Sequence, residues 1–145
     1  PMTESESVPI SGGCLCGAIR WEADLPPRAS VLCHCDTCRR ATGAGAVGWL
    51  VFDIAVFRFV RGEPQTYHTD TQADRTFCST CGTPLTYHHS ADRPGDMDVT
   101  SGSADAPDDR PPTKDIFVEE KLTWTTRAEG PHSRCDTNNT REIAQ

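Results

Sequence analysis

Residues 12–17 have the sequence GGCLCG and residues 78–82 have the sequence CSTCG, and these two stretches decide the fold. Each places two cysteines on one short turn, beside glycines that permit a tight backbone. A Cys-x-x-Cys turn can direct both sulfurs at one metal ion, and zinc takes four ligands in a tetrahedron. The two pairs together predict a closed, structural four-thiolate zinc site on Cys14, Cys16, Cys78 and Cys81. Such a site would join the start of the chain to its middle and add to the folding free energy.

A third cysteine motif, Cys-x-Cys-x-x-Cys, lies between these stretches. Its three thiols, Cys33, Cys35 and Cys38, leave one of the four zinc positions for water or substrate, which is typical of catalytic zinc. Two alternatives would close this site instead. Cys135, alone in the polar C-terminal region, could complete a second structural zinc, or His34 could be the fourth ligand. An extended backbone would direct the His34 side chain away from its two neighbours, which disfavours the second alternative.

Two arginines, Arg39 and Arg40, follow the third motif directly. Zinc with three thiolates carries a net charge of −1, so these side chains could offset it or could hold an anionic substrate. Each is equally compatible with a solvated surface position.

The overall composition excludes several functional classes. The 145 residues include 21 acidic and 14 basic ones, which gives a net charge of −7 and argues against nucleic-acid binding. Mean hydropathy is −0.52, and no apolar run reaches the roughly 20 residues that a membrane span needs. The first residues are acidic and polar, without the pattern of a signal peptide. Eight cysteines in such a chain favour metal binding in a reducing compartment, so we expect a cytoplasmic protein.

Short strands punctuated by glycine and proline predict a mainly β domain. We expect a disordered leader over residues 1–9, one domain over 10–126 and a polar tail over 127–145. Strands are predicted within 10–21 and at 31–33, 46–52, 55–60, 74–78, 84–88, 96–100 and 116–119, with one helical turn at 39–42. No amphipathic helix of ten residues is visible. The large aromatic residues are predicted to lie in the core: Trp21, Trp49, Trp124, Phe57 and Phe59.

The three cysteine motifs, in this order and spacing, resemble the glutathione-dependent formaldehyde-activating enzyme family, which also includes centromere protein V-like proteins. Residues 12–21, 33–40 and 77–85 carry the resemblance, and 101–105 and 116–124 look like the C-terminal part of that family. The likeness covers about residues 10–125. It departs at Asp115, where the family often has a histidine, and it ends after Arg127.

The resemblance implies an Mss4-like complex β-sheet fold with zinc knuckles and few or no long helices. It implies the same two zinc sites that the spacing predicts. It also implies a carbon–sulfur lyase of the S-(hydroxymethyl)glutathione synthase type, which joins glutathione or a similar thiol to formaldehyde or another small aldehyde. On this reading a thiol binds at the three-cysteine zinc, and Arg39 or Arg40 holds one of its carboxylates. The alternative is a non-catalytic, zinc-stabilised binding module of the same fold, because fold alone does not determine function.

Overall fold

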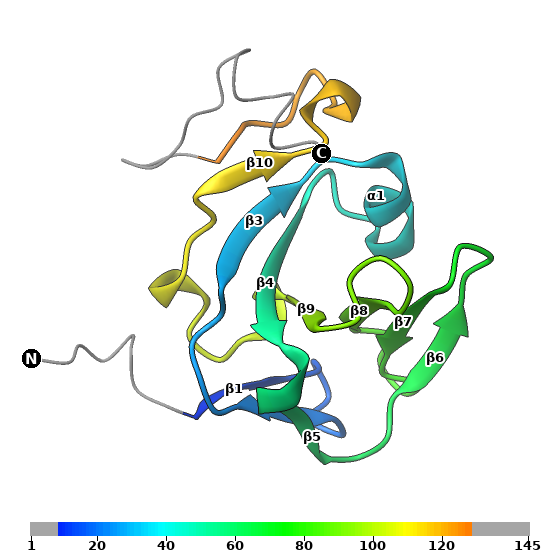
Figure 1. Ribbon diagram of the computed structural model, residues 1–145, viewed down its shortest axis with the longest axis vertical. Coiled ribbons are helices and arrows are strands. Elements are labelled where there is room, and N and C mark those ends of the chain that lie inside the picture. Colours follow the sequence, from blue (N-terminus) through cyan, green and yellow to red (C-terminus); the bar gives the residue numbers. More distant parts are fainter. Residues whose placement is uncertain (1–8, 129–145) are drawn as a thin grey trace, which may run out of the picture.

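The computed structural model describes residues 9–128, which form a mainly β fold with one α-helix (Figure 1). The strands are β1 (Ile10–Gly13), β2 (Arg20–Ala23), β3 (Ala29–Cys33), β4 (Val47–Asp53), β5 (Phe57–Arg61), β6 (Gln65–His68), β7 (Ala73–Phe77), β8 (Pro84–His89), β9 (Asp96–Thr100) and β10 (Lys114–Ile116); the helix α1 spans Asp36–Thr42. Residues 1–8 and 129–145 lie outside the described part, and so do nearly all of the expected leader and tail, including Cys135.

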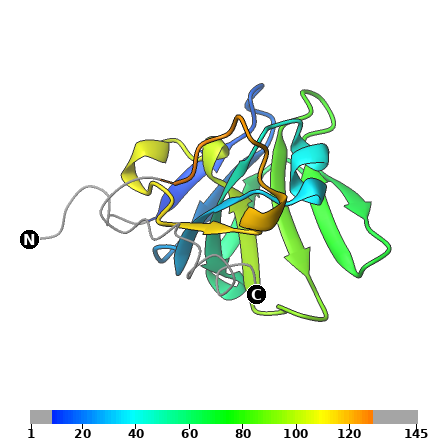
Figure 2. The same cartoon turned by 90° about the horizontal axis from the view of Figure 1, so that it is seen from above.

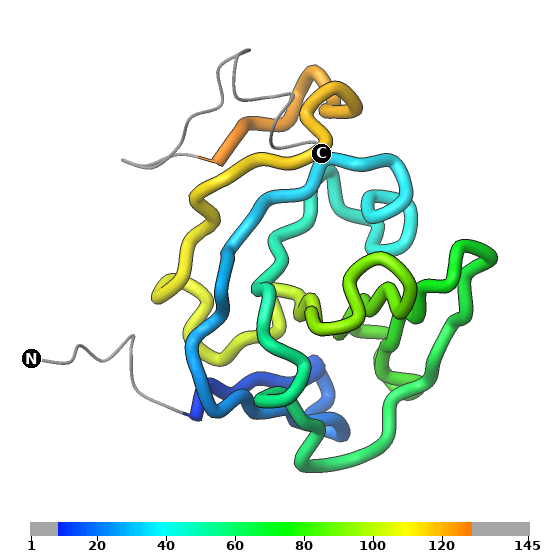
Figure 3. Tube along the Cα trace, in the orientation of Figure 1, coloured from blue at the N-terminus to red at the C-terminus, as the bar shows by residue number. Residues whose placement is uncertain are grey.

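The strands form two sheets. The smaller sheet has the order β1-β2-β5, and the larger one has the order β10-β3-β4-β9-β8-β7-β6. All neighbouring strands pair antiparallel except β10 and β3, which run parallel. In the view of Figure 1, and in the trace of Figure 3, the smaller sheet lies at the lower end and α1 at the upper end. Figure 2 shows the strong twist of the larger sheet seen from above.

The main core lies where the two sheets meet. Trp21 of β2 is fully buried and packs its ring against Phe52 of β4 and Phe57 of β5, with ring centroids 5.9 and 5.8 Å apart. The indole nitrogen of Trp21 donates a hydrogen bond to the Ser103 hydroxyl at 3.1 Å. Leu85 completes the cluster from β8. On β2 buried side chains alternate with half-buried ones, whereas β4 is buried on both faces. Leu50 and Phe52 of β4 belong to this main core, and its Val47 and Trp49 belong to a second cluster that also holds Cys33 and Cys38.

The fold confirms the expected mainly β architecture with few helices. Three local expectations were wrong. The helix expected at 39–42 begins earlier, at Asp36, because the Cys35 sulfur accepts a hydrogen bond from the Cys38 nitrogen and caps it. The strand expected at 116–119 is β10 at Lys114–Ile116 followed by a 3₁₀ turn at Val118–Glu120, because Phe117 takes a left-handed conformation (φ 56°) that ends the strand. Trp124 is not in the core: 73 % of it is exposed. No helix within residues 9–128 is long and apolar enough to cross a membrane.

The turn after β5 requires glycine at position 62. Gly62 has a φ of +74°, and a Cβ built there would lie 2.2 Å from the Ala18 carbonyl oxygen. We expect Gly62→Ala to lower the free energy of unfolding by roughly 3 kcal/mol, from the left-handed backbone and the clash together.

The matched control is Gly43→Ala at the end of α1. Gly43 has a similar φ of +78°, but nothing lies within 4 Å of its would-be Cβ, so its cost should be only about 1 kcal/mol. Urea unfolding of the metal-loaded protein measures both changes. Equal losses for the two variants would contradict the role of the close contact.

Candidate metal centres and active site

The first cysteine group joins the two sheets. Cys14 and Cys16 lie on the turn between β1 and β2, and Cys78 and Cys81 lie on the turn between β7 and β8. Their four sulfurs all lie within 4.8 Å of one another. A further hydrogen bond, from the Leu15 backbone nitrogen to the Thr83 hydroxyl at 3.0 Å, holds the two turns together. The group therefore links chain segments that are more than 60 residues apart.

These four residues fit a zinc ion. The sulfurs of Cys14 and Cys16 are 3.7 Å apart, and those of Cys16 and Cys78 are 3.8 Å apart. Sulfurs about 2.3 Å from a tetrahedral zinc are separated by about 3.8 Å, whereas a disulfide would require about 2.05 Å. All seven cysteines of the described residues are free thiols. The distances thus match a shared metal ion and not a covalent bridge.

Backbone and side-chain donors prepare this group for a cation. The Ile19 nitrogen donates to the Cys14 sulfur at 3.2 Å, and the Cys81 nitrogen donates to the Cys78 sulfur at 3.4 Å. Hydrogen bonds from the Thr83 side chain and backbone lower the pKa of Cys81 to about 5. A thiol with such a pKa is already ionised at neutral pH, in the state that a metal requires.

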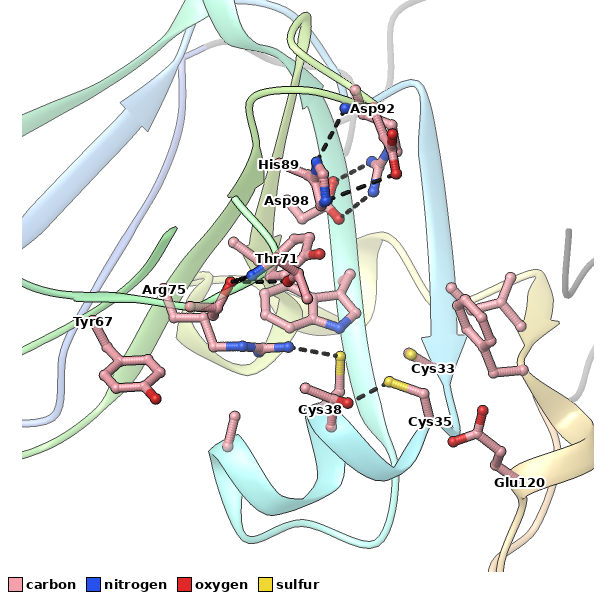
Figure 4. A pocket seen from close by; sticks show the side chains of 18 of the residues that line it. Cys33, Cys35, Cys38, Tyr67, Thr71, Arg75, His89, Asp92, Asp98 and Glu120 are labelled. Atoms are coloured by element: carbon pink, nitrogen blue, oxygen red, sulfur yellow. Dashed lines mark hydrogen bonds and ion pairs between the residues drawn. The ribbon is translucent and has the colours of Figure 1, made fainter. Parts of the chain in front are cut away.

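The second group is local in sequence. Cys33 ends β3, Cys35 precedes α1, and Cys38 lies in its first turn (Figure 4). The Cys35 sulfur accepts a hydrogen bond from the Cys38 nitrogen at 3.2 Å and so caps the helix. The three sulfurs all lie within 4.8 Å of one another, which fits three ligands of one zinc ion.

Crowding of the three thiols concentrates negative charge on Cys38. Hydrogen bonds from Cys33 and Cys35, together with a smaller effect of the Arg75 guanidinium, lower the pKa of Cys38 to about 2. The contact with Cys35 raises the pKa of Cys33, so the group holds its remaining protons until a metal displaces them.

No other histidine, cysteine or carboxylate within residues 9–128 joins the second group. His34 is fully buried, and its Nε2 lies 2.7 Å from the Asp115 carboxylate. Asp115 also accepts a hydrogen bond from the Ala128 nitrogen at 2.9 Å. The His34–Asp115 pair holds the second cysteine group against β10. The sulfurs of that group face a cavity. Cys135, the other alternative, lies outside the described residues.

This cavity has a volume of about 1030 Å³, which is large enough for a peptide-sized ligand. Figure 4 shows the sulfurs between Arg75 of β7 on one side and Glu120 on the other, with His89, Asp92 and Asp98 farther along the wall. Arg75 and Glu120, which are far apart in the sequence, therefore face each other across the second cysteine group.

The charged groups of the cavity differ in their partners. Arg93 donates two hydrogen bonds to Asp98, at 2.6 and 2.9 Å, and one to Asp96 at 3.1 Å. These contacts raise the pKa of Arg93, whereas burial raises the pKa of Asp98. Arg75 has no carboxylate partner among the described residues: its guanidinium lies 4.7 Å from the centre of the Tyr87 ring and 3.5 Å from the Cys38 sulfur.

The sequence model of the family described as glutathione-dependent formaldehyde-activating enzyme matches residues 9–120, which include both groups. The chain belongs to the glutathione-dependent formaldehyde-activating enzyme family. A crystal structure of a Rhodobacter sphaeroides protein is similar to it, with 27% sequence identity and a TM-score of 0.57, over 66% of this chain and 88% of that one. No curated protein matches significantly.

In this member of the formaldehyde-activating family, Arg39 and Arg40 do not line the cavity. Both side chains pair with Asp36 in the first turn of α1, and the Arg40 side chain is 75% exposed. Their expected role in holding a substrate carboxylate stays a prediction.

Four side chains that line the cavity around the second cysteine group were not predicted from the sequence. Tyr67, Arg75, Tyr87 and Glu120 come from β6, β7, β8 and the 3₁₀ turn after β10. None belongs to a cysteine motif, and only the pairing of β7 with β8 brings Arg75 and Tyr87 opposite each other. The sequence did hold one indication that Arg75 does not point to open solvent. Side chains alternate along a strand, so within residues 73–77 Arg75 is expected on the same face as the apolar Ala73 and Phe77.

Proposed function

We propose that this member of the family is a carbon–sulfur lyase that joins a small thiol, such as glutathione, to formaldehyde or another small aldehyde. The observation that carries the proposal is the composition of the second cysteine group. Three thiol ligands face a cavity of about 1030 Å³, and the described residues supply no fourth. Catalytic zinc sites characteristically have three protein ligands and one exchangeable position.

In this proposal Cys33, Cys35 and Cys38 hold the reactive metal, and the first cysteine group holds the scaffold zinc: Cys14, Cys16, Cys78 and Cys81. Zinc bound to the three thiolates supplies a Lewis acid that lowers the pKa of a thiol ligand. The chain fixes the position of the three ligands by two means. Cys33 is part of the β3–β4 pairing, and the helix cap at Cys35 sets the spacing to Cys38.

The cavity walls orient the two reactants. Trp49, Tyr87 and Phe117 give it apolar surface next to the sulfurs, while Arg75 and Glu120 give it charge. The reaction forms one carbon–sulfur bond as the carbonyl π-bond opens, and the resulting alkoxide takes up the proton that the thiol lost. The reverse reaction returns thiol and aldehyde. Confining both reactants at one wall supplies the proximity that a reaction between two small molecules lacks in solution.

The test measures exchange between glutathione and formaldehyde by NMR line shape, with the zinc-loaded protein. We expect the protein to accelerate exchange between free and adduct formaldehyde, and we expect Cys35→Ala to lose the acceleration together with one zinc. Turnover that persists with any thiol and aldehyde after one zinc is lost would contradict the proposal.

The same sample separates the alternative of a binding module. A non-catalytic second zinc would be closed, so added thiols would neither bind to it nor exchange. A wild-type protein with two zinc ions that binds no thiol would therefore exclude the lyase and favour the module.

A further inference from the structure

Arg75 has an unusual position for a cationic side chain. It leaves β7 and extends along the cavity wall toward Cys38, as Figure 4 shows. Its guanidinium lies over the Tyr87 ring at 4.7 Å, and its Nη2 is 3.5 Å from the Cys38 sulfur. The ring fixes the face of the guanidinium and leaves its edge to act as donor.

Most of the N–H donors of Arg75 have no acceptor within residues 9–128. A guanidinium carries five N–H donors in a planar fork. Among residues 9–128, the Arg75 side chain makes one hydrogen bond, to the Cys38 sulfur. By contrast Arg93, the other arginine of the cavity wall, is held by Asp96 and Asp98. Arg75 is therefore the cavity arginine whose donors can receive an anion.

The other charges around the cavity restrict where that anion can lie. Asp70, Asp92 and Glu120 line the remaining walls and would repel a carboxylate placed near them. A carboxylate can pair favourably only beside Arg75. In a thiol whose sulfur lies at the cysteine group, that carboxylate must be within a few bonds of the sulfur. A planar carboxylate also matches the donor fork of a guanidinium in a bidentate pair.

We propose that Arg75 is a specificity-determining residue, which selects thiols that carry a carboxylate within a few bonds of the sulfur. The selection rests on the proposed function, because it requires that a thiol enter this cavity. Arg75 binds the carboxylate, and Cys33, Cys35 and Cys38 face the sulfur end of the same molecule.

The test compares two thiols of equal size, 3-mercaptopropionate and its neutral amide, by calorimetric titration of the zinc-loaded protein without aldehyde. We expect wild type to bind the carboxylate roughly 10- to 100-fold more tightly, as one charge-assisted hydrogen-bonded pair allows. Arg75→Met keeps the length of the side chain and its contact with Tyr87, and should reduce the preference to about onefold. Comparing the ratio between the two proteins cancels the intrinsic difference between the thiols.

Three further variants complete the design. Arg75→Lys keeps the charge without the fork, and should retain only part of the preference; it also carries the test if Arg75→Met loads less zinc. Lys114→Met removes a positive charge from the exposed edge strand β10, outside the cavity, and should keep the full preference. Arg40→Met examines the arginine expected from the sequence, and a loss of preference there and not at Arg75 would overturn the assignment.

The outcomes separate two failures. If wild type binds both thiols equally, or if Arg75→Met weakens both by the same factor, Arg75 acts only on the cysteine group and the inference is wrong, while the lyase proposal stands. If wild type binds neither of these thiols nor glutathione, the proposed function itself fails.

Discussion

Cys78→Ser is expected to prevent the protein from folding at room temperature. Cys78 is 1% exposed, within the core cluster that also contains Cys14 and Leu85, and it contributes one of four sulfurs that connect the two sheets. A structural zinc supplies an apparent 10–16 kcal/mol in small zinc domains. Losing even about half of that equals the whole stability of a typical domain. Far-ultraviolet circular dichroism and zinc analysis measure the result.

The control for this variant lies on the same turn. Ser79 is exposed and is not a ligand, so Ser79→Ala should melt within a few degrees of wild type and keep both zinc ions. Treatment of wild type with a strong chelator should reproduce the effect of Cys78→Ser. A Cys78→Ser protein that melts within a few degrees of wild type would show that the four sulfurs do not carry the fold.

The second large effect is expected at the other group. Cys38→Ser should lower the zinc content from two ions to one and reduce thiol–aldehyde exchange by at least about a hundredfold, since even outer partners of metal ligands cost 10- to 100-fold. The fold should survive, because the three cysteines of this group lie within six residues and bridge no distant segments. Melting should fall by only a few degrees. The two variants therefore serve as mutual controls: Cys38→Ser loses one zinc and keeps the fold, whereas Cys78→Ser loses the fold.

Cys38→Ser would contradict the site assignment in either of two ways. Exchange at wild-type rate with one zinc would place the chemistry elsewhere. Complete unfolding would mean that the second group, like the first, is part of the scaffold.

The sequence predicted the cysteine groups well, because ligand spacing on short turns is a local property. Both groups have the membership expected from the motifs, and the sulfurs converge as the spacing requires. The strands around them were also predictable from alternation and from glycine and proline positions. The strand at β6 was not, since its alternation is weak and its side chains are mostly exposed.

The wall of the cavity could not be predicted, because it depends on sheet order. Arg75 faces Cys38 only because α1 lies near β7, the second strand from one edge of the larger sheet, an arrangement that no local pattern encodes. Trp124 illustrates the opposite error: an aromatic residue was expected inside by type alone, although it follows the short 3₁₀ turn and lies on the surface beside Gly45. Residue type predicts burial less well outside a regular strand.

The contrast in sequence span between the two cysteine groups has a consequence for synthesis of the protein in a cell. The trio at 33–38 is complete as soon as one short segment has left the ribosome, whereas the quartet needs residue 81 to emerge before its last sulfur exists. The nascent chain therefore contains the complete three-cysteine group before it contains the complete four-cysteine group. We therefore expect the supply of metal during translation to act first on the three-cysteine group and only later on the four-cysteine group.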